Sequence, residues 1–195
     1  MATKEIRRSF QIAQDGSGLK IGIVSAHSHP EVVGPLVTGT KKALLERGVG
    51  RNSLRFLHVM RPFDLPFAAK AMLQREKTSS GGGLDGIICL GCMVRDENKS
   101  RFGFESEAVA LGIMKLNLKA DIPVVYGVLT CVNEQQALGF VGQSSSHVAE
   151  DHGWEWAKAV ISLARLSRSL KEDAEEEERE KESRVSQQQV VTVAE

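Results

Sequence analysis

The stretch LKIGIVS, residues 19–25, decides the fold of this chain. It is a short, nearly continuous apolar run rich in β-branched residues, which is typical of a strand buried on both faces. Pro30 then stands where a helix can begin, and apolar residues recur at helical spacing until Gly48, which favours a helix end. The sequence therefore predicts a buried strand followed directly by a helix.

The same alternation of strand and helix recurs along the rest of the chain. Further strands are predicted over 54–59, 86–94 and 123–129, and further helices over 65–74, 105–118, 134–141 and 154–170. This order indicates an α/β fold with one parallel sheet, helices on both faces and right-handed crossovers. Ligands of such sheets bind beyond the carboxyl ends of the strands. Four loops are therefore expected to lie together: 26–30, 60–63, 95–104 and 130–133.

Length and composition indicate a soluble protein of one domain with an appendage. The chain has 195 residues and is 42% apolar, but it contains no run of about 18 apolar residues that would span a membrane. Residues 1–14 mix charges without an apolar segment, so no secretory signal is predicted. Its cysteines are too few, and too embedded in apolar runs, for a disulfide framework, which favours the cytoplasm.

The charge of the chain is divided between two segments. Twenty-five basic residues balance twenty-five acidic ones, but residues 171–195 hold nine acids and four bases. This segment therefore carries a net charge of −5 and residues 1–170 carry +5. We predict an N-terminal arm over 1–17, a domain over 18–170, and a tail over 171–195 that is a frayed helix turning disordered. A solvated tail is favoured over one that interacts.

Two histidines follow the first predicted strand. His27 and His29 flank Ser28 at an expected crevice edge, where imidazoles can transfer protons or bind a metal ion. Helix capping and simple exposure are alternatives. Because no third ligand is recognisable, metal binding is the weakest of these interpretations, and no metal site is predicted.

A Cys-x-x-Cys spacing occurs inside the strand predicted over 86–94. Residues three apart in a strand point to opposite faces, so Cys89 and Cys92 are not expected to converge on a metal ion or to form a disulfide. We interpret both as core residues, with Cys92 nearer the crevice.

The loop RDENKSR, residues 95–101, precedes a helix, where backbone N–H groups favour an anion. Asp96 and Glu97 oppose that preference and Lys99 and Arg101 restore it, so an anion clamp and a solvated loop remain equal alternatives. The glycines of residues 81–83 lack the lysine of a phosphate loop and are interpreted as a linker. No basic face interleaved with aromatic residues is evident, so nucleic-acid binding is not predicted.

The order of these motifs resembles the lumazine synthase family, over about residues 18–166. The stretches that carry the resemblance are 21–24 (IGIV), 63–66 (FDLP), 68–70 (AAK), 84–86 (LDG), 90–91 (LG), 122–130 (IPVVYGVLT), 134–137 (EQQA) and 152–156 (HGWEW). The resemblance implies a flavodoxin-like three-layer α/β/α fold, with a four-stranded parallel sheet of order 2-1-3-4. It also implies a homopentamer, or a shell of sixty subunits, with sites between subunits and residues 9–13 added to a neighbour's sheet.

The resemblance further implies an activity without metal or organic cofactor. That activity is the condensation of 5-amino-6-ribitylaminouracil with a four-carbon dihydroxybutanone phosphate, through Schiff-base formation, phosphate elimination and ring closure. The product, 6,7-dimethyl-8-ribityllumazine, belongs to riboflavin biosynthesis.

Several site positions depart from the family's pattern. The aromatic platform for the pyrimidine ring falls on residues 27–29 (HSH), and the ribityl-binding motif reads 60–64 (MRPFD). The phosphate loop becomes 95–98 (RDEN), which places two carboxylates where a phosphate would bind. The catalytic histidine falls on Ser100 or Arg101, and the phosphate-binding arginine on Phe140. These changes in one expected crevice favour an altered ligand.

The expected site combines the crevice with residues of an adjacent subunit. The residues expected to act in catalysis are His27, His29 and Arg101. Those expected to bind the substrate are Ser28, Arg61, Phe63, Asp64, Cys92, Asp96, Glu97, Asn98, Lys99, Phe140 and His152. The leading hypothesis is an enzyme for a different carbonyl, amine or heteroaromatic substrate. The alternatives are ordinary lumazine synthesis and a non-catalytic assembling or ligand-binding subunit.

Overall fold

The computed structural model describes residues 14–78, 82–95, 99–141 and 148–193. Four parallel strands form its sheet in the order β2-β1-β3-β4. Their bounds are Ile21–Ala26 for β1, Leu54–Val59 for β2, Gly86–Val94 for β3 and Val124–Cys131 for β4. The predicted parallel α/β sheet of order 2-1-3-4 is confirmed.

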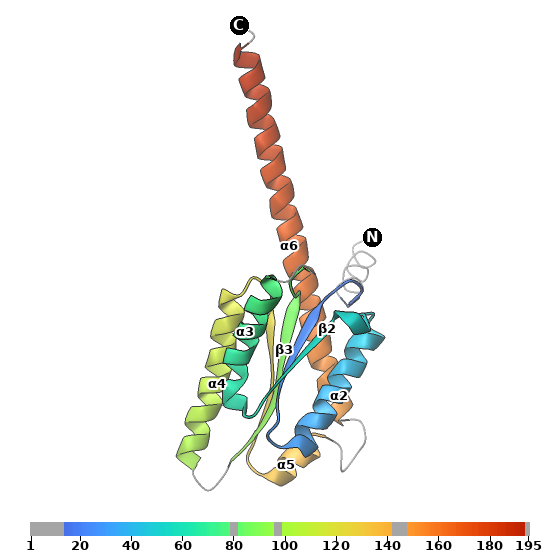
Figure 1. Cartoon of the computed structure of the whole chain (residues 1–195), viewed down its shortest axis with the longest axis vertical. Coiled ribbons are helices and arrows are strands. Elements are labelled where there is room, and N and C mark those ends of the chain that lie inside the picture. The colour runs from blue at the N-terminus through green and yellow to red at the C-terminus, as the bar shows by residue number, and fades with distance from the viewer. Residues whose placement is uncertain (1–13, 79–81, 96–98, 142–147, 194–195) are drawn as a thin grey trace, which may run out of the picture.

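Helices cover both faces of the sheet, as Figure 1 shows. Helices α3 (Leu65–Lys77) and α4 (Lys99–Lys119) pack on one face. Helices α2 (Pro30–Glu46) and α6 (Val148–Val193) pack on the other. Short turns complete the fold: η1 (Arg51–Ser53), η2 (Pro62–Asp64) and the short helix α5 (Glu134–Gly139).

The central strands explain why the apolar runs are continuous. All six residues of β1 are buried, and β3 is buried up to its last residue, because each strand is flanked by strands and covered by helices on both faces. The edge strand β2 instead exposes several of its side chains. Position in the sheet, rather than strand propensity alone, therefore sets these patterns.

Asp85 ties α6 to the start of two central strands. Its carboxylate accepts a hydrogen bond from the backbone N–H of Lys20 at 2.7 Å and another from Nε of Arg168 at 2.8 Å. The guanidinium of Arg168 also donates to the carbonyl oxygen of Gly18 at 3.1 Å. Charge-assisted bonds of this kind are among the stronger ones in proteins. They fix the angle at which α6 crosses the sheet.

Helix α4 begins earlier than its apolar periodicity predicts. Residues 99–104, expected to be a loop, are helical, so the predicted polar loop over 95–104 is wrong in its second half. Arg101 donates from Nε to Glu105 one turn later at 2.9 Å, and the half-buried Phe102 packs against the core. These two contacts stabilise the first turn of α4, which its polar residues do not predict from apolar periodicity.

The last helix is a single element of 46 residues that leaves the domain (Figure 1). It includes the residues for which the sequence predicts a frayed helix turning disordered. Residues 171–179 are all exposed, and ion pairs at i,i+4 spacing join Glu175 to Arg179 and Glu177 to Lys181. The strand predicted around residues 9–13 lies outside the described residues. No helix in the described part of the chain is both long and apolar enough to cross a membrane.

Candidate functional site

A polar crevice opens where β1 and β3 end, on the edge of the sheet that the topology predicts. Its volume is about 160 Å³. The residues that line it come from the β1–α2 turn, the η2 turn, the end of β3 and the first turns of α4. They are Ser28, His29, Arg61, Pro62, Phe63, Cys92, Met93, Val94, Arg101, Phe102 and Glu105.

His29 occupies an unusual backbone conformation at the start of α2. Its φ of 52° and ψ of 61° lie in the left-handed region, which costs a non-glycine residue about 1 kcal/mol or more. Its carbonyl oxygen accepts hydrogen bonds from the backbone N–H groups of Val32 and Val33, each at 2.9 Å. Its Nδ1 lies 3.5 Å from a carboxylate oxygen of Glu31. The imidazole is therefore held at the crevice by the backbone and oriented by a carboxylate.

Cys92 is among the residues that line the crevice, and its side chain is buried in the core. The hydroxyl of Ser28 donates to its carbonyl oxygen at 3.5 Å. Burial first, and then the neighbouring Cys131 and Glu31, raise the pKa of Cys92 to about 12. A thiol with this pKa stays protonated near neutral pH and is a poor nucleophile. Cys89 packs in a different core cluster from Cys92, which confirms that the two side chains lie on opposite faces of β3.

The η2 turn places one cation and one aromatic ring at the crevice. Arg61 is exposed and donates from its guanidinium to Asp64 at 3.3 Å. The ring of Phe63 is half exposed and lines the same space. Asp64 is the residue before α3, and it contacts the crevice through Arg61 rather than lining it. This turn therefore offers an anion anchor beside an apolar surface.

The first turns of α4 supply a second arginine. Arg101 lines the crevice while its Nε is bonded to Glu105, so the guanidinium is held at one end by its own helix. Five further residues line the crevice and were not predicted: Pro62, Met93, Val94, Phe102 and Glu105. The sequence feature that could have indicated Glu105 is its i,i+4 spacing from Arg101. This spacing predicts an ion pair only if both residues are helical, and the helix start at Lys99 was not predicted.

Besides Asp64, three described residues of the predicted site do not line this crevice within one subunit. His27 is exposed, and its backbone N–H donates to the carbonyl oxygen of Val59 at 2.8 Å. Phe140 and His152 instead contact each other, with ring centroids 5.4 Å apart, and His152 stacks on Trp156 at 5.6 Å. Their expected role opposite a neighbouring subunit's crevice stays a prediction. Asp96, Glu97 and Asn98 lie outside the described residues, as does the side chain of Lys99.

The donor set of the crevice suits an anionic or polar organic molecule. Two guanidinium groups can bind carboxylate or phosphate, and one imidazole can donate or accept a hydrogen bond. Phe63 and Phe102 supply apolar surface. Among the described residues, no group of three or more His, Cys, Asp or Glu side chains is placed to hold a metal ion.

A parallel α/β sheet with a polar crevice at the carboxyl ends of its strands defines the class of small-molecule-processing α/β proteins. The family model described as 6,7-dimethyl-8-ribityllumazine synthase matches residues 18–168. The 6,7-dimethyl-8-ribityllumazine synthase of Streptomyces avermitilis is 34% identical over 154 residues, which cover 79% of this chain and 88% of the relative. The chain belongs to the lumazine synthase family.

Proposed function

We propose that this protein is a lumazine synthase-family enzyme that condenses a flat heteroaromatic amine with a carbonyl compound other than the family's usual substrates. The observation that carries this proposal is the pair of arginines that line the crevice, each bonded to a carboxylate three or four residues along the chain, together with His29. This arrangement anchors an anionic substrate group. Phe63 supplies an apolar surface for the heteroaromatic ring.

The reaction begins with attack of the substrate amine on the carbonyl carbon of the second substrate. The nitrogen loses both of its protons, the carbonyl oxygen gains two protons and leaves as water, and a carbon–nitrogen double bond forms. His29 is the group in the crevice suited to move these protons, because an imidazole can act as a general acid or base and a guanidinium cannot. Arg101 and Arg61 hold the anionic group of a substrate during these steps.

Ordinary lumazine synthesis is the second candidate. It is favoured by the identity of 34% to a lumazine synthase over most of the length of both chains. In that case His29 would replace the family's histidine as the base, and Arg101 would bind the substrate phosphate. The two candidates share the crevice and differ only in the molecules that it accepts.

The size of the crevice supports a site shared between subunits. A volume of about 160 Å³ is smaller than the roughly 300–1,000 Å³ of typical ligand pockets, so a neighbouring chain would complete the enclosure. An exposed apolar stripe supports assembly: Leu111, Met114 and Leu118 on α4, and Leu163, Leu166 and Leu170 on α6. A homopentamer, or a shell of sixty subunits, is the assembly proposed from the family. The three buried free cysteines fit a reducing cytoplasm.

One experiment separates the candidates. The purified protein is incubated with 5-amino-6-ribitylaminouracil and the dihydroxybutanone phosphate, and the gene is introduced into a riboflavin-requiring host that lacks lumazine synthase. Absence of product and of growth, combined with turnover of another amine and carbonyl pair, is the expected result. Growth at the rate of a control lumazine synthase contradicts the proposal and favours the second candidate. Absence of turnover on every pair tested contradicts both and favours a non-catalytic subunit.

Substitution of the histidines tests the assigned role. His29→Asn keeps a side chain that tolerates the left-handed backbone and removes the titratable ring. We expect it to lower kcat by about 100-fold or more, in the range of a lost general acid–base group, with the circular dichroism spectrum unchanged. His27→Asn is the matched comparison. If kcat falls only in this variant, the acid–base role belongs to His27. Full activity in both variants contradicts an acid–base histidine in this crevice.

A further inference from the structure

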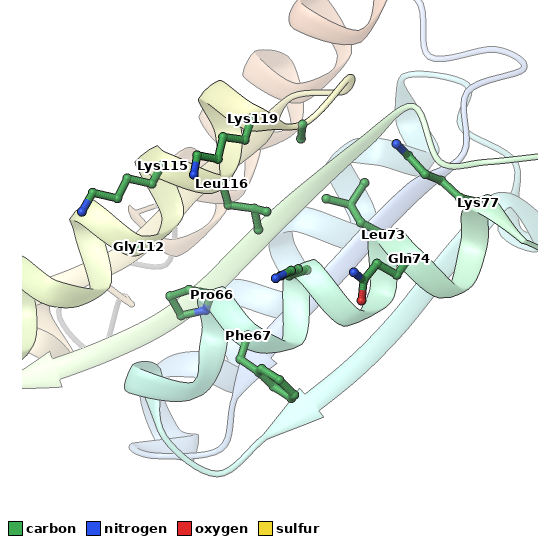
Figure 2. A pocket seen from close by; sticks show the side chains of 11 residues that line it. Pro66, Phe67, Leu73, Gln74, Lys77, Gly112, Lys115, Leu116 and Lys119 are labelled. Atoms are coloured by element: carbon green, nitrogen blue, oxygen red, sulfur yellow. The ribbon is translucent and has the colours of Figure 1, made fainter.

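A second and larger cavity lies between α3 and α4, on the face of the domain away from α2 and α6. Its volume is about 460 Å³. Its apolar surface comes from Pro66, Phe67 and Leu73 on α3 and from Leu116 and Ala120 at the end of α4. Figure 2 shows Leu73 and Lys77 on one of the two elements, and Leu116, Lys115 and Lys119 on the other. The cavity shares no lining residue with the crevice, so it forms a separate site, which we call the lysine groove.

The charge of the lysine groove is entirely positive. Lys70 and Lys77 line the α3 side, and Lys115 and Lys119 line the α4 side, while no carboxylate is among the lining residues. Lys77 donates to Asp121 at 2.6 Å. Within the described part of the chain, Lys70, Lys115 and Lys119 have no ion pair. Three like charges beside an apolar floor favour an anionic partner that also has an apolar side.

The chain itself carries a helix with the opposite charge. Residues 171–179 of α6 contain six carboxylates and two basic side chains, and all nine residues are exposed. Glu175 and Glu177 pair with Arg179 and Lys181 on the same helix. Among the described residues, Glu172 and Glu176 have no ion pair, and their i,i+4 spacing places them on one face. Lys115 and Lys119 have the same spacing on α4, so each pair of charges is about 6 Å apart along its helix axis.

The geometry of α6 determines which copy of the groove this segment can reach. The segment continues a straight helix away from the domain (Figure 1), and at 1.5 Å per residue its last 23 residues extend about 35 Å. A continuous helix cannot turn back to the side of its own domain. We propose that the lysine groove binds the acidic part of α6, residues 171–179, from a second copy of this chain. This contact uses no crevice residue and does not depend on the proposed catalytic function.

Disulfide trapping between two full-length chains tests this contact. One chain carries Lys115→Cys and one affinity tag, and the other carries Glu176→Cys and a second tag; the two are produced together and oxidised mildly. The native thiols are buried, and burial raises the pKa of Cys89 to about 12, so they do not compete. We expect a cross-linked product that contains both tags. Lys158→Cys, paired with Glu176→Cys, is the matched control on the opposite face of the domain and is expected to give none.

Charge dependence provides the second measurement. Raising the salt from about 0.1 M to about 1 M shortens the Debye length from about 10 Å to about 3 Å, which screens contacts between exposed charges. We expect the cross-linked fraction to fall under high salt. Lys119→Glu in the groove chain is expected to lower that fraction by about tenfold, as about 1.4 kcal/mol of lost pairing would.

Three results would overturn the proposal. The first is a yield for the Lys115 pair no higher than that for the Lys158 control. The second is a disulfide within one chain, and none between chains, when a single chain carries both Lys115→Cys and Glu176→Cys. The third is a cross-link unaffected by both salt and Lys119→Glu, because docking would then not depend on charge.

Discussion

Cys89 shows at the scale of one residue how burial controls chemistry. Its side chain is fully buried, and burial raises the pKa of its thiol from 9.0 to about 12. Below pH 9 the thiol is neutral in both the folded and the unfolded chain. Above pH 9 the unfolded chain releases the proton that the folded chain still holds. The free energy of unfolding therefore falls as the pH rises from 9 towards 12.

This reasoning gives a pH prediction for stability. In urea unfolding between pH 8 and about 11, the thiol of Cys89 contributes a loss approaching about 1.4 kcal/mol for each pH unit above its unfolded pKa. Cys89→Ala removes this titration, so we expect the variant to be less stable at pH 8 but to lose less stability at high pH. Equal slopes for the variant and the natural protein would show that Cys89 is ionised in the fold.

His29 and Arg101 show how far individual site residues could be predicted from the sequence. Residue type and position after a strand were enough to place both at the crevice. The left-handed backbone of His29 and its contact with Glu31 could not be predicted, because both depend on how the turn meets α2. Glu105 was missed for a similar reason, since its role follows from a helix start hidden among polar residues.

Gly153 is the position at which element packing depends on the absence of a side chain. A Cβ atom added here would lie 2.5 Å from the backbone nitrogen of Thr40 and 2.6 Å from the carbonyl carbon of Gly39. Both are backbone atoms of α2 and cannot rotate away. The glycine therefore sets the distance between α2 and α6 on one face of the sheet.

The expected result of Gly153→Ala is a destabilisation of about 1–3 kcal/mol, the usual cost of overpacking. Gly34→Ala on α2 is the matched control, because nothing lies within 4 Å of its added Cβ. Since alanine is the better helix former, this control should be neutral or up to about 1 kcal/mol more stable. Thermal and urea unfolding measure both changes, and equal effects would contradict the close contact of the helices.

The strands were predicted more accurately than the ends of the helices. Residues 54–59 and 86–94 were predicted with the bounds that the structure has, because buried parallel strands form continuous apolar runs between turns. Helix α4 begins six residues before its predicted start, and its first turn depends on the ion pair of Arg101 and on Phe102 rather than on apolar periodicity. The local sequence pattern therefore predicted the buried strands. It missed the start of α4, which is stabilised by contacts of individual side chains.

At the scale of the whole molecule, the apolar stripe on α4 and α6 is the surface suited to assembly. Met114 is 53% exposed, so a charge there leaves the core intact but would be buried in an interface. We expect Met114→Glu to lower the mass of the assembly in multi-angle light scattering, with an unchanged unfolding curve for the released subunit. Val132→Glu, at a residue 50% exposed outside the stripe, is the control and should keep the original mass. An unchanged mass for Met114→Glu would place the subunit contacts elsewhere.

The partnership of α2 and α6 also determines the order in which the chain can complete its fold during synthesis. Helix α2 ends at Glu46, yet α6 begins only at Val148, so about a hundred residues are made before this face of the sheet is covered. Until then the part of α2 that packs against α6 lacks this partner, and a nascent chain exposes it to aggregation. The last helix is thus the closing step of folding, and a chain cut short before it is expected to need a chaperone to stay in solution.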